Sequence, residues 1–121
     1  MDQDRPLAGV LDHRVDVAHD VVRAGKVRYI GCSNLAAWQL DKFSHASDTH
    51  LWSRFISLQP IYNALTRSIE SELLPLCAEE QIAVIPYNPL AGGLLTGKHP
   101  PGAPTEGTRF TLGRSQELYR E

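Results

Sequence analysis

The apolar positions of the chain change between a helical spacing and short continuous runs. Apolar residues three and four positions apart, the spacing of one helix face, cover residues 7–22, 35–46 and 69–80. Runs rich in β-branched and aromatic side chains cover residues 27–31, 55–59 and 82–86. The predicted order is therefore helix, strand, helix, strand, helix, strand. This alternation favours a parallel sheet whose strands are joined by right-handed crossovers.

Individual residues indicate where these elements end. Gly25 suits the left-handed position that follows a helix, and Ser33 or Asn34 can cap the helix predicted from residue 35. The polar stretch 48–50 is expected to break that same helix. Pro75 lies inside the third helical pattern, where a proline kinks a helix or leaves one hydrogen bond unmade, at a cost of about 3 kcal/mol.

The chain changes character after the last predicted strand. Residues 82–86 are continuously apolar up to a proline, which is typical of a strand buried on both faces of a parallel sheet. From Asn88 onward glycine and proline are frequent, and this composition predicts a long loop. A loop of this length is unusual in a compact domain and normally has a function or lacks its partner.

Two architectures of the α/β class fit this order of elements. One is a small open sheet, and the other is a section of a (β/α)₈ barrel, which needs about 250 residues to close. The chain has 121 residues, the length of one domain. About three parallel strands would leave two unpaired edges and apolar surface facing water. We therefore expect marginal stability and self-association through the sheet edges.

Composition excludes several classes of function. Twelve Lys and Arg residues stand against 14 Asp and Glu residues, and the sequence pI is near 6.2, which argues against an electrostatic grip on nucleic acid. The sequence contains no apolar run long enough to cross a membrane and no secretory signal at its start, so a cytoplasmic location is expected. The two cysteines are interpreted as reduced, packed thiols. The five histidines lack metal-ligand spacing, so no metal site is predicted.

Four segments together carry a family resemblance. The phrase GKVRYIGCSN at residues 25–34 resembles the aldo/keto reductase signature that enters the sixth strand of that barrel. The segments LQPIYN at 58–63, ELLPLC at 72–77 and PYNPLAGGLLTGK at 86–98 resemble three further parts of the family in the same order. The resemblance implies a partial (β/α)₈ barrel, and the long loop is most similar to the branch of potassium-channel β-subunits and their bacterial relatives. A proline also occurs in the family's corresponding helix, which accounts for Pro75.

The resemblance implies a site for the nicotinamide of NADPH. Ser33, Asn34 and Gln59 match the family residues that hold the carboxamide, and such side chains supply the donors and acceptors that an amide needs. Tyr87 matches the tyrosine that stacks on the nicotinamide ring. Taken without the resemblance, the residues favour structural roles: Asn34 as a helix cap, Gln59 as a surface residue at a strand end and Tyr87 as a core aromatic.

The glycine-rich segment after Tyr87 resembles the loop that grips the cofactor pyrophosphate. Its glycines let backbone N–H groups approach phosphate, and its lysine adds a point charge. The candidate residues are Asn88, Pro89, Leu90, Gly92, Leu94, Gly97 and Lys98. Two positions depart from the family pattern: Asn88 stands where serine is more common, and His99 replaces an aromatic residue after the lysine.

The family's reaction is the NADPH-dependent reduction of aldehydes and ketones by a tetrad of Asp, Tyr, Lys and His. No residue of this chain matches any of the four, so no catalytic residue is assigned. Residues 1–121 are interpreted as one partial reductase domain from the middle-to-late part of the barrel, inactive in isolation. The alternative is a non-catalytic dinucleotide-binding or protein-interaction module, which a genuine start at Met1 would favour. The carbonyl substrate, and the choice of NADPH or NADH, stay open.

Overall fold

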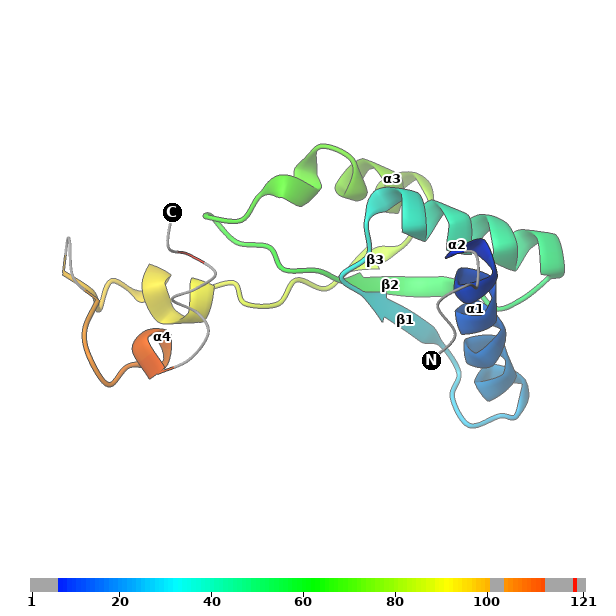
Figure 1. The fold of residues 1–121 in the computed structure, drawn as a ribbon, viewed down its shortest axis with the longest axis horizontal. Helices are drawn as coiled ribbons and strands as arrows, with labels where there is room; N and C mark the ends of the chain where they lie inside the picture. Colours follow the sequence, from blue (N-terminus) through cyan, green and yellow to red (C-terminus); the bar gives the residue numbers. More distant parts are fainter. Residues whose placement is uncertain (1–6, 101–103, 113–118, 120–121) are drawn as a thin grey trace. The chain divides into compact units, whose positions relative to one another are not determined.

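The computed structural model describes residues 7–100, 104–112 and 119 (Figure 1). The described residues form two compact units, one within 7–60 and 69–85 and the other within 61–68 and the described positions from 86 onward. In chain order the elements are α1 (Leu7–Arg23), β1 (Ile30–Ser33), α2 (Ala37–His50), β2 (Phe55–Gln59), the 3₁₀ helix η1 (Ser68–Glu70), α3 (Leu73–Glu79), β3 (Ala83–Val84), the 3₁₀ segment η2 (Ala91–Thr96) and α4 (Arg109–Leu112).

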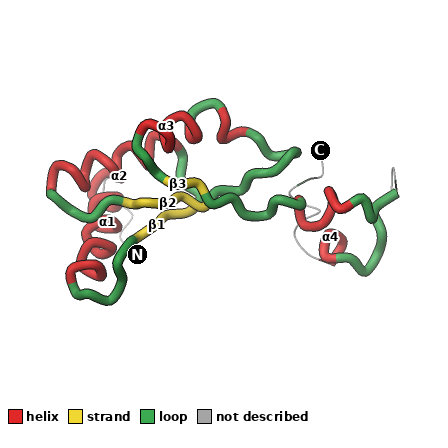
Figure 2. The backbone as a smooth tube through the Cα atoms, turned by 180° about the vertical axis from the view of Figure 1, so that it is seen from behind, coloured by secondary structure: helices red, strands yellow, loops and turns green. Residues whose placement is uncertain are grey.

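The first unit contains a three-stranded parallel sheet in the order β1-β2-β3, which confirms the predicted alternation of strands and helices (Figure 2). Cys32 lies opposite Leu58, and Ser33 lies opposite Gln59. Along β1, half-buried and exposed residues alternate, so Cys32 faces the core while Ser33 faces solvent. Because parallel strands end at the same edge, this register brings the polar ends of β1 and β2 together.

The main core lies between this sheet and helices α2 and α3. Its buried centre contains Leu40 from α2, Leu58 from β2 and Cys77 from α3. A second cluster joins α1 to α2 through Val15 and Phe43, and the ring of Phe43 meets that of Phe55 edge-on at 5.6 Å. Burial of these side chains is what stabilises the short strands, since each strand alone contributes few hydrogen bonds.

The end of α1 agrees with the prediction from the sequence, and the end of α2 does not. Gly25 has φ +69° and, as predicted, follows α1; its N–H donates to the carbonyl of Val22 at 2.9 Å. The predicted break at residues 48–50 is wrong, because α2 continues to His50 and ends at Leu51. Within this last turn the Thr49 hydroxyl donates to the carbonyl of His45 at 2.8 Å, a bond that helical geometry allows.

The start of α2 also differs from the prediction. The helix begins at Ala37, so neither Ser33 nor Asn34 caps it. Instead the side chain of Gln39 reaches back, and its Oε1 accepts the N–H of Ala36 at 2.9 Å. Asn34 adopts a left-handed conformation with φ +53°, in the turn between strand and helix. The side chains of Ser33 and Asn34 are therefore not used as caps.

Two strand predictions need correction. The first strand begins at Ile30 rather than at residue 27, because Val27 and Tyr29 are exposed and unpaired in the sheet. The third strand is shorter than 82–86 and is not buried on both faces: Ala83 and Ile85 are exposed. Hydrogen-bonded pairing with β2 sets the boundaries of both strands, and an apolar run in the sequence does not show which residues pair.

Pro75 causes no kink. The predicted helix 69–80 divides into η1 and α3, and Pro75 is the third residue of α3. A proline in the first helical turn removes an N–H that has no partner inside the helix, so the expected cost of an unmade hydrogen bond does not arise. The family resemblance had already suggested that a proline is accommodated here.

The second unit holds most of the predicted loop. Ile61 and Tyr87 form an isolated parallel bridge, and the Tyr62 N–H donates to the Tyr87 carbonyl at 3.4 Å. The loop contains two short helical segments, η2 and α4, which the glycine and proline content concealed.

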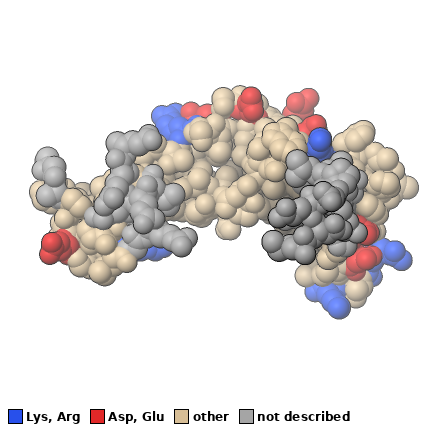
Figure 3. All heavy atoms as spheres, in the orientation of Figure 1, with Lys and Arg blue, Asp and Glu red and all other residues tan. Residues whose placement is uncertain are grey.

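Among the described residues no helix could span a membrane. On the face drawn in Figure 3, acidic and basic side chains are interspersed within the sheet unit rather than gathered by sign.

Candidate functional site

The polar residues that end β1 and β2 lie together. The Ser33 hydroxyl donates to the Gln59 carbonyl at 2.7 Å, and the Asn34 N–H donates to the same oxygen at 3.3 Å. All three residues are exposed at the carboxyl end of the sheet. The Ser33 oxygen keeps its lone pairs for an incoming N–H, and the Gln59 side chain offers both donors and an acceptor. This set can therefore hold an amide.

A close approach of β1 and β2 sets this spacing. A Cβ atom placed on Gly31 would lie 2.4 Å from the Ser57 Oγ and 3.1 Å from the Ser57 carbonyl oxygen. The Ser57 hydroxyl could rotate away from such a Cβ, but the carbonyl oxygen belongs to the backbone of β2, so any side chain at position 31 would be crowded against that strand. Gly31 thus keeps the two strands at the distance that brings Ser33 to Gln59.

In the second unit, Asn88 organises the start of the glycine-rich loop. Its φ of +58° is a left-handed conformation that asparagine tolerates better than most residues. Its side-chain Oδ1 accepts the Gly92 N–H at 2.6 Å, and its carbonyl accepts the Ala91 N–H at 3.0 Å. Asparagine at the position where the family more often has serine is therefore accommodated, and it closes the first turn of the loop.

The glycines of this loop adopt conformations that other residues rarely take. Gly92, Gly93 and Gly97 have φ values of +69°, +112° and +73°. The Leu90 carbonyl accepts the N–H groups of Gly93 at 2.8 Å and Leu95 at 3.2 Å. The result is a pair of 3₁₀ turns with a kink at the two adjacent glycines, of which Gly92 is buried and Gly93 is half-buried.

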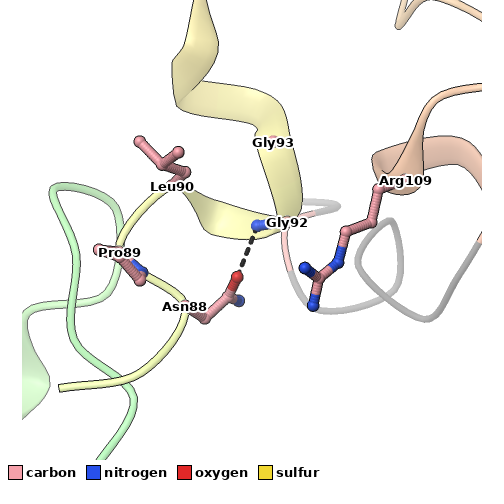
Figure 4. A pocket seen from close by; sticks show the side chains of 6 residues that line it. All are labelled: Asn88, Pro89, Leu90, Gly92, Gly93 and Arg109. Atoms are coloured by element: carbon pink, nitrogen blue, oxygen red, sulfur yellow. Dashed lines mark hydrogen bonds between the residues drawn. The ribbon is translucent and has the colours of Figure 1, made fainter.

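A cavity of about 300 Å³ opens beside this backbone (Figure 4). Its lining residues are Asn88, Pro89, Leu90, Gly92, Gly93 and Arg109. Four of these belong to the predicted set, which the cavity brings together. Tyr87, Leu94, Gly97 and Lys98 do not line it, although Lys98 lines a second cavity next to it.

Sequence reasoning missed two of the residues that line this cavity, Gly93 and the charged Arg109. Figure 4 shows the Arg109 side chain extending from α4 toward Gly92 and Asn88. A guanidinium is always charged and forms paired hydrogen bonds with phosphate oxygens. The available signal was a lone arginine 12 positions after the GK pair, in a stretch too irregular to place before the fold of the loop was known.

The remaining predictions about chemistry concern metals and thiols. Among the described residues, no three His, Cys, Asp or Glu side chains gather closely enough to hold a metal ion. Cys32 and Cys77 are free thiols of the sheet core, as interpreted from the sequence. Burial, and secondarily the neighbouring Cys77, raises the pKa of Cys32 to about 11, which keeps this thiol protonated and unreactive at neutral pH.

Comparison with known proteins identifies the family. The Aldo/keto reductase family model matches residues 3–113, and the chain belongs to this family. It is 37% identical to protein Tas of Escherichia coli over 107 residues, 88% of this chain and 31% of Tas. It is 39% identical to versiconal hemiacetal acetate reductase of Aspergillus parasiticus over 77 residues, 64% of this chain and 22% of that protein.

The fold comparison agrees with the sequence comparison. An aldo/keto reductase from Klebsiella pneumoniae, crystallised with NADP and acetate, matches 77% of this chain and 32% of its own length, with a TM-score of 0.62 and 28% identity. The chain thus spans less than a third of the length of these relatives. Its parallel strands and helices are a section of the (β/α)₈ barrel of an oxidoreductase family, which confirms the predicted fold class.

Proposed function

We propose that this chain is the part of an aldo/keto reductase that binds NADPH. The observation that carries the proposal is the grouping of Ser33, Asn34 and Gln59 on one carbonyl oxygen at the carboxyl end of the sheet. Ligands bind at this end of parallel strands. We assign these three residues to the nicotinamide carboxamide and Tyr87 to the ring. When bound, NADPH supplies the hydride that reduces an aldehyde or ketone.

The second unit fits the phosphate part of the same cofactor. Gly93 is half-buried and lines the cavity without a side chain, and a Cβ there would meet only open space. Asn88 holds the turn in place, and Arg109 brings a positive charge to the same cavity. We propose that this cavity takes the pyrophosphate. Pro89 and Leu90 form its apolar wall, while Leu94, Gly97 and Lys98 continue the loop and add a further charge.

The contribution of this chain is binding rather than proton transfer. The family reaction needs a proton donor, and no residue here matches the family's Asp, Tyr, Lys and His. We propose that the isolated chain binds NADPH without reducing a carbonyl compound, and that the open edges of β1 and β3 lead to self-association. A chain that bound NADPH and acted in this form would be the non-catalytic module of the alternative interpretation.

The test measures binding and turnover separately. NADPH fluorescence is titrated with the wild-type chain, Gln59→Ala and Arg109→Ala, and NADPH oxidation is followed with benzaldehyde as the carbonyl compound. We expect saturable binding, about tenfold weaker in each variant because a hydrogen bond or charge contact is lost, and no oxidation. Binding that neither substitution weakens would contradict the proposed site. Oxidation of NADPH by the wild-type chain would contradict the assignment of a binding role alone.

A further inference from the structure

A second cavity, of about 200 Å³, shares Gly92, Gly93 and Arg109 with the first. Its lining is completed by Thr96, Lys98, His99 and Thr108. Three basic residues, Lys98, His99 and Arg109, therefore line one small cavity, and its lining contains no carboxylate among the residues that the structure describes. Within the described part of the chain, the ion pairs involve Arg54 and not these three residues. A cavity with this lining is suited to an anion.

The imidazole of His99 is held in one orientation and one tautomer. Its Nδ1 accepts the backbone N–H of Thr105 at 3.0 Å. A backbone N–H can only donate, so Nδ1 is the acceptor and the ring proton lies on Nε2. The ring also packs against Phe110, which is buried, with centroids 5.4 Å apart. The Thr105 hydroxyl donates to the Lys98 carbonyl at 2.9 Å and closes the loop around His99.

Because Nδ1 is occupied by the Thr105 N–H, the Nε2–H is the side-chain group of His99 that can donate a hydrogen bond to a ligand. We propose that His99 is a phosphate-binding residue of this chain, whose Nε2–H donates to a phosphate group of the dinucleotide in the second cavity. Lys98 and Arg109 supply the charge there, and His99 supplies an N–H donor in a fixed orientation. This inference rests on the proposed function, because the two cavities meet at Gly92, Gly93 and Arg109. It gives a role to the residue that departs from the family's aromatic pattern.

Two substitutions separate the binding role of His99 from its role in the loop. In His99→Asn the amide oxygen can replace Nδ1 as the acceptor for Thr105, but the donor at the Nε2 position is lost. In His99→Gln the amide nitrogen reaches about the Nε2 position, while the acceptor for Thr105 is lost. The dissociation constants for NADPH and for inorganic pyrophosphate are measured by calorimetry for the wild-type chain and both variants.

We expect His99→Asn to weaken both ligands about tenfold, the loss of one hydrogen bond to a charged group, and His99→Gln to weaken them less than threefold. Equal affinity of the wild type and His99→Asn, or equal weakening by both substitutions, would overturn the inference and leave the proposed function standing. Pyrophosphate binding that depends on His99, with no NADPH binding, would support the phosphate contact and overturn the proposed function. Failure of the wild type to bind either ligand would overturn both.

Discussion

The side chain of Asn63 donates through Nδ2 to the main-chain carbonyl of Asn88 at 3.0 Å and to the Tyr119 hydroxyl at 2.8 Å. The same residue uses its Oδ1 to accept the N–H groups of Leu65 and Thr66, at 2.9 and 3.0 Å. Asn63 is almost fully buried, and all its hydrogen-bonding capacity is used. One asparagine thus joins the segment after β2 to the start of the glycine-rich loop.

This link predicts that Asn63→Asp disturbs the loop selectively. The aspartate keeps the acceptor for Leu65 and Thr66 but replaces the donor to Asn88 with an oxygen that repels its carbonyl. We expect faster hydrogen exchange of the Gly92 amide and NADPH binding weakened by about tenfold, since an unsatisfied buried group costs about 1–3 kcal/mol. The control is Gln81→Glu, the same amide-to-carboxylate change at an exposed position of the sheet unit that lies outside this network and outside the proposed site. Unchanged exchange at Gly92 in Asn63→Asp would show that the link does not hold the loop.

The contact of Gly31 with Ser57 predicts a stability effect. In Gly31→Ala the new Cβ would lie 2.4 Å from the Ser57 Oγ and 3.1 Å from the Ser57 carbonyl oxygen, so the hydroxyl must rotate or the strands must shift, and overpacking of this kind costs about 1–3 kcal/mol. In Gly31→Ala/Ser57→Ala the Oγ is removed and part of the loss should return. Urea unfolding of the two single variants and the double variant measures the coupling. Strictly additive effects would be inconsistent with this contact.

The buried Cys32 predicts that stability falls at alkaline pH. Its pKa rises from 9.0 to about 11 because burial, and then Cys77, disfavour the thiolate. Between these values the unfolded thiol loses its proton while the folded one keeps it, so the free energy of unfolding decreases as pH increases. Below pH 9 both states are protonated and this group has no effect. Urea unfolding between pH 8.5 and 10.5 should show a shallower decrease in Cys32→Ala; equal slopes would argue against the pKa shift.

The contacts of His19 are predicted to stabilise the packing of α1 against the segment that precedes β2. Its Nδ1 accepts the Ser53 N–H at 3.0 Å, and its ring stacks on Trp52, which also stacks on His50. His19→Ala should lower the free energy of unfolding by about 1 kcal/mol for the lost hydrogen bond. His50→Ala, the matched control, removes a stacked ring without that bond. Trp52 fluorescence during thermal unfolding compares the two, and a larger loss of stability in His50→Ala would refute this assignment.

The sequence predicted the elements that local pattern defines and missed those that depend on pairing. Strand β2 occupies residues 55–59 as expected, because its alternation and the proline that follows it are local signals. The predicted end of α2 was wrong. Asp48, Thr49 and His50 are poor helix formers by themselves, but the packing of the preceding turns stabilises the helix enough to include them. The short extent of β3 could not be seen either, because it follows from which residues face β2.

The same distinction applies to the site. Ser33 and Gln59 were found because a family motif marks them, and the register of β1 with β2 then brings them together. Arg109 lies in a stretch without periodicity, and only the fold of the loop places it beside Gly92. The role of Asn63 was hidden for a similar reason, since its partner Asn88 is 25 positions away.

The central claim is that the polar ends of β1 and β2 contact the nicotinamide of NADPH and that the glycine-rich loop contacts its phosphates. The most direct measurement is an NMR titration of the isotopically labelled chain with NADPH, following the backbone amide resonances. We predict saturable shifts with a common dissociation constant at Ser33, Asn34 and Gln59 and at residues 87–98, and none along α2. Shifts confined to the loop, or spread evenly over α2 and the sheet, would contradict the account.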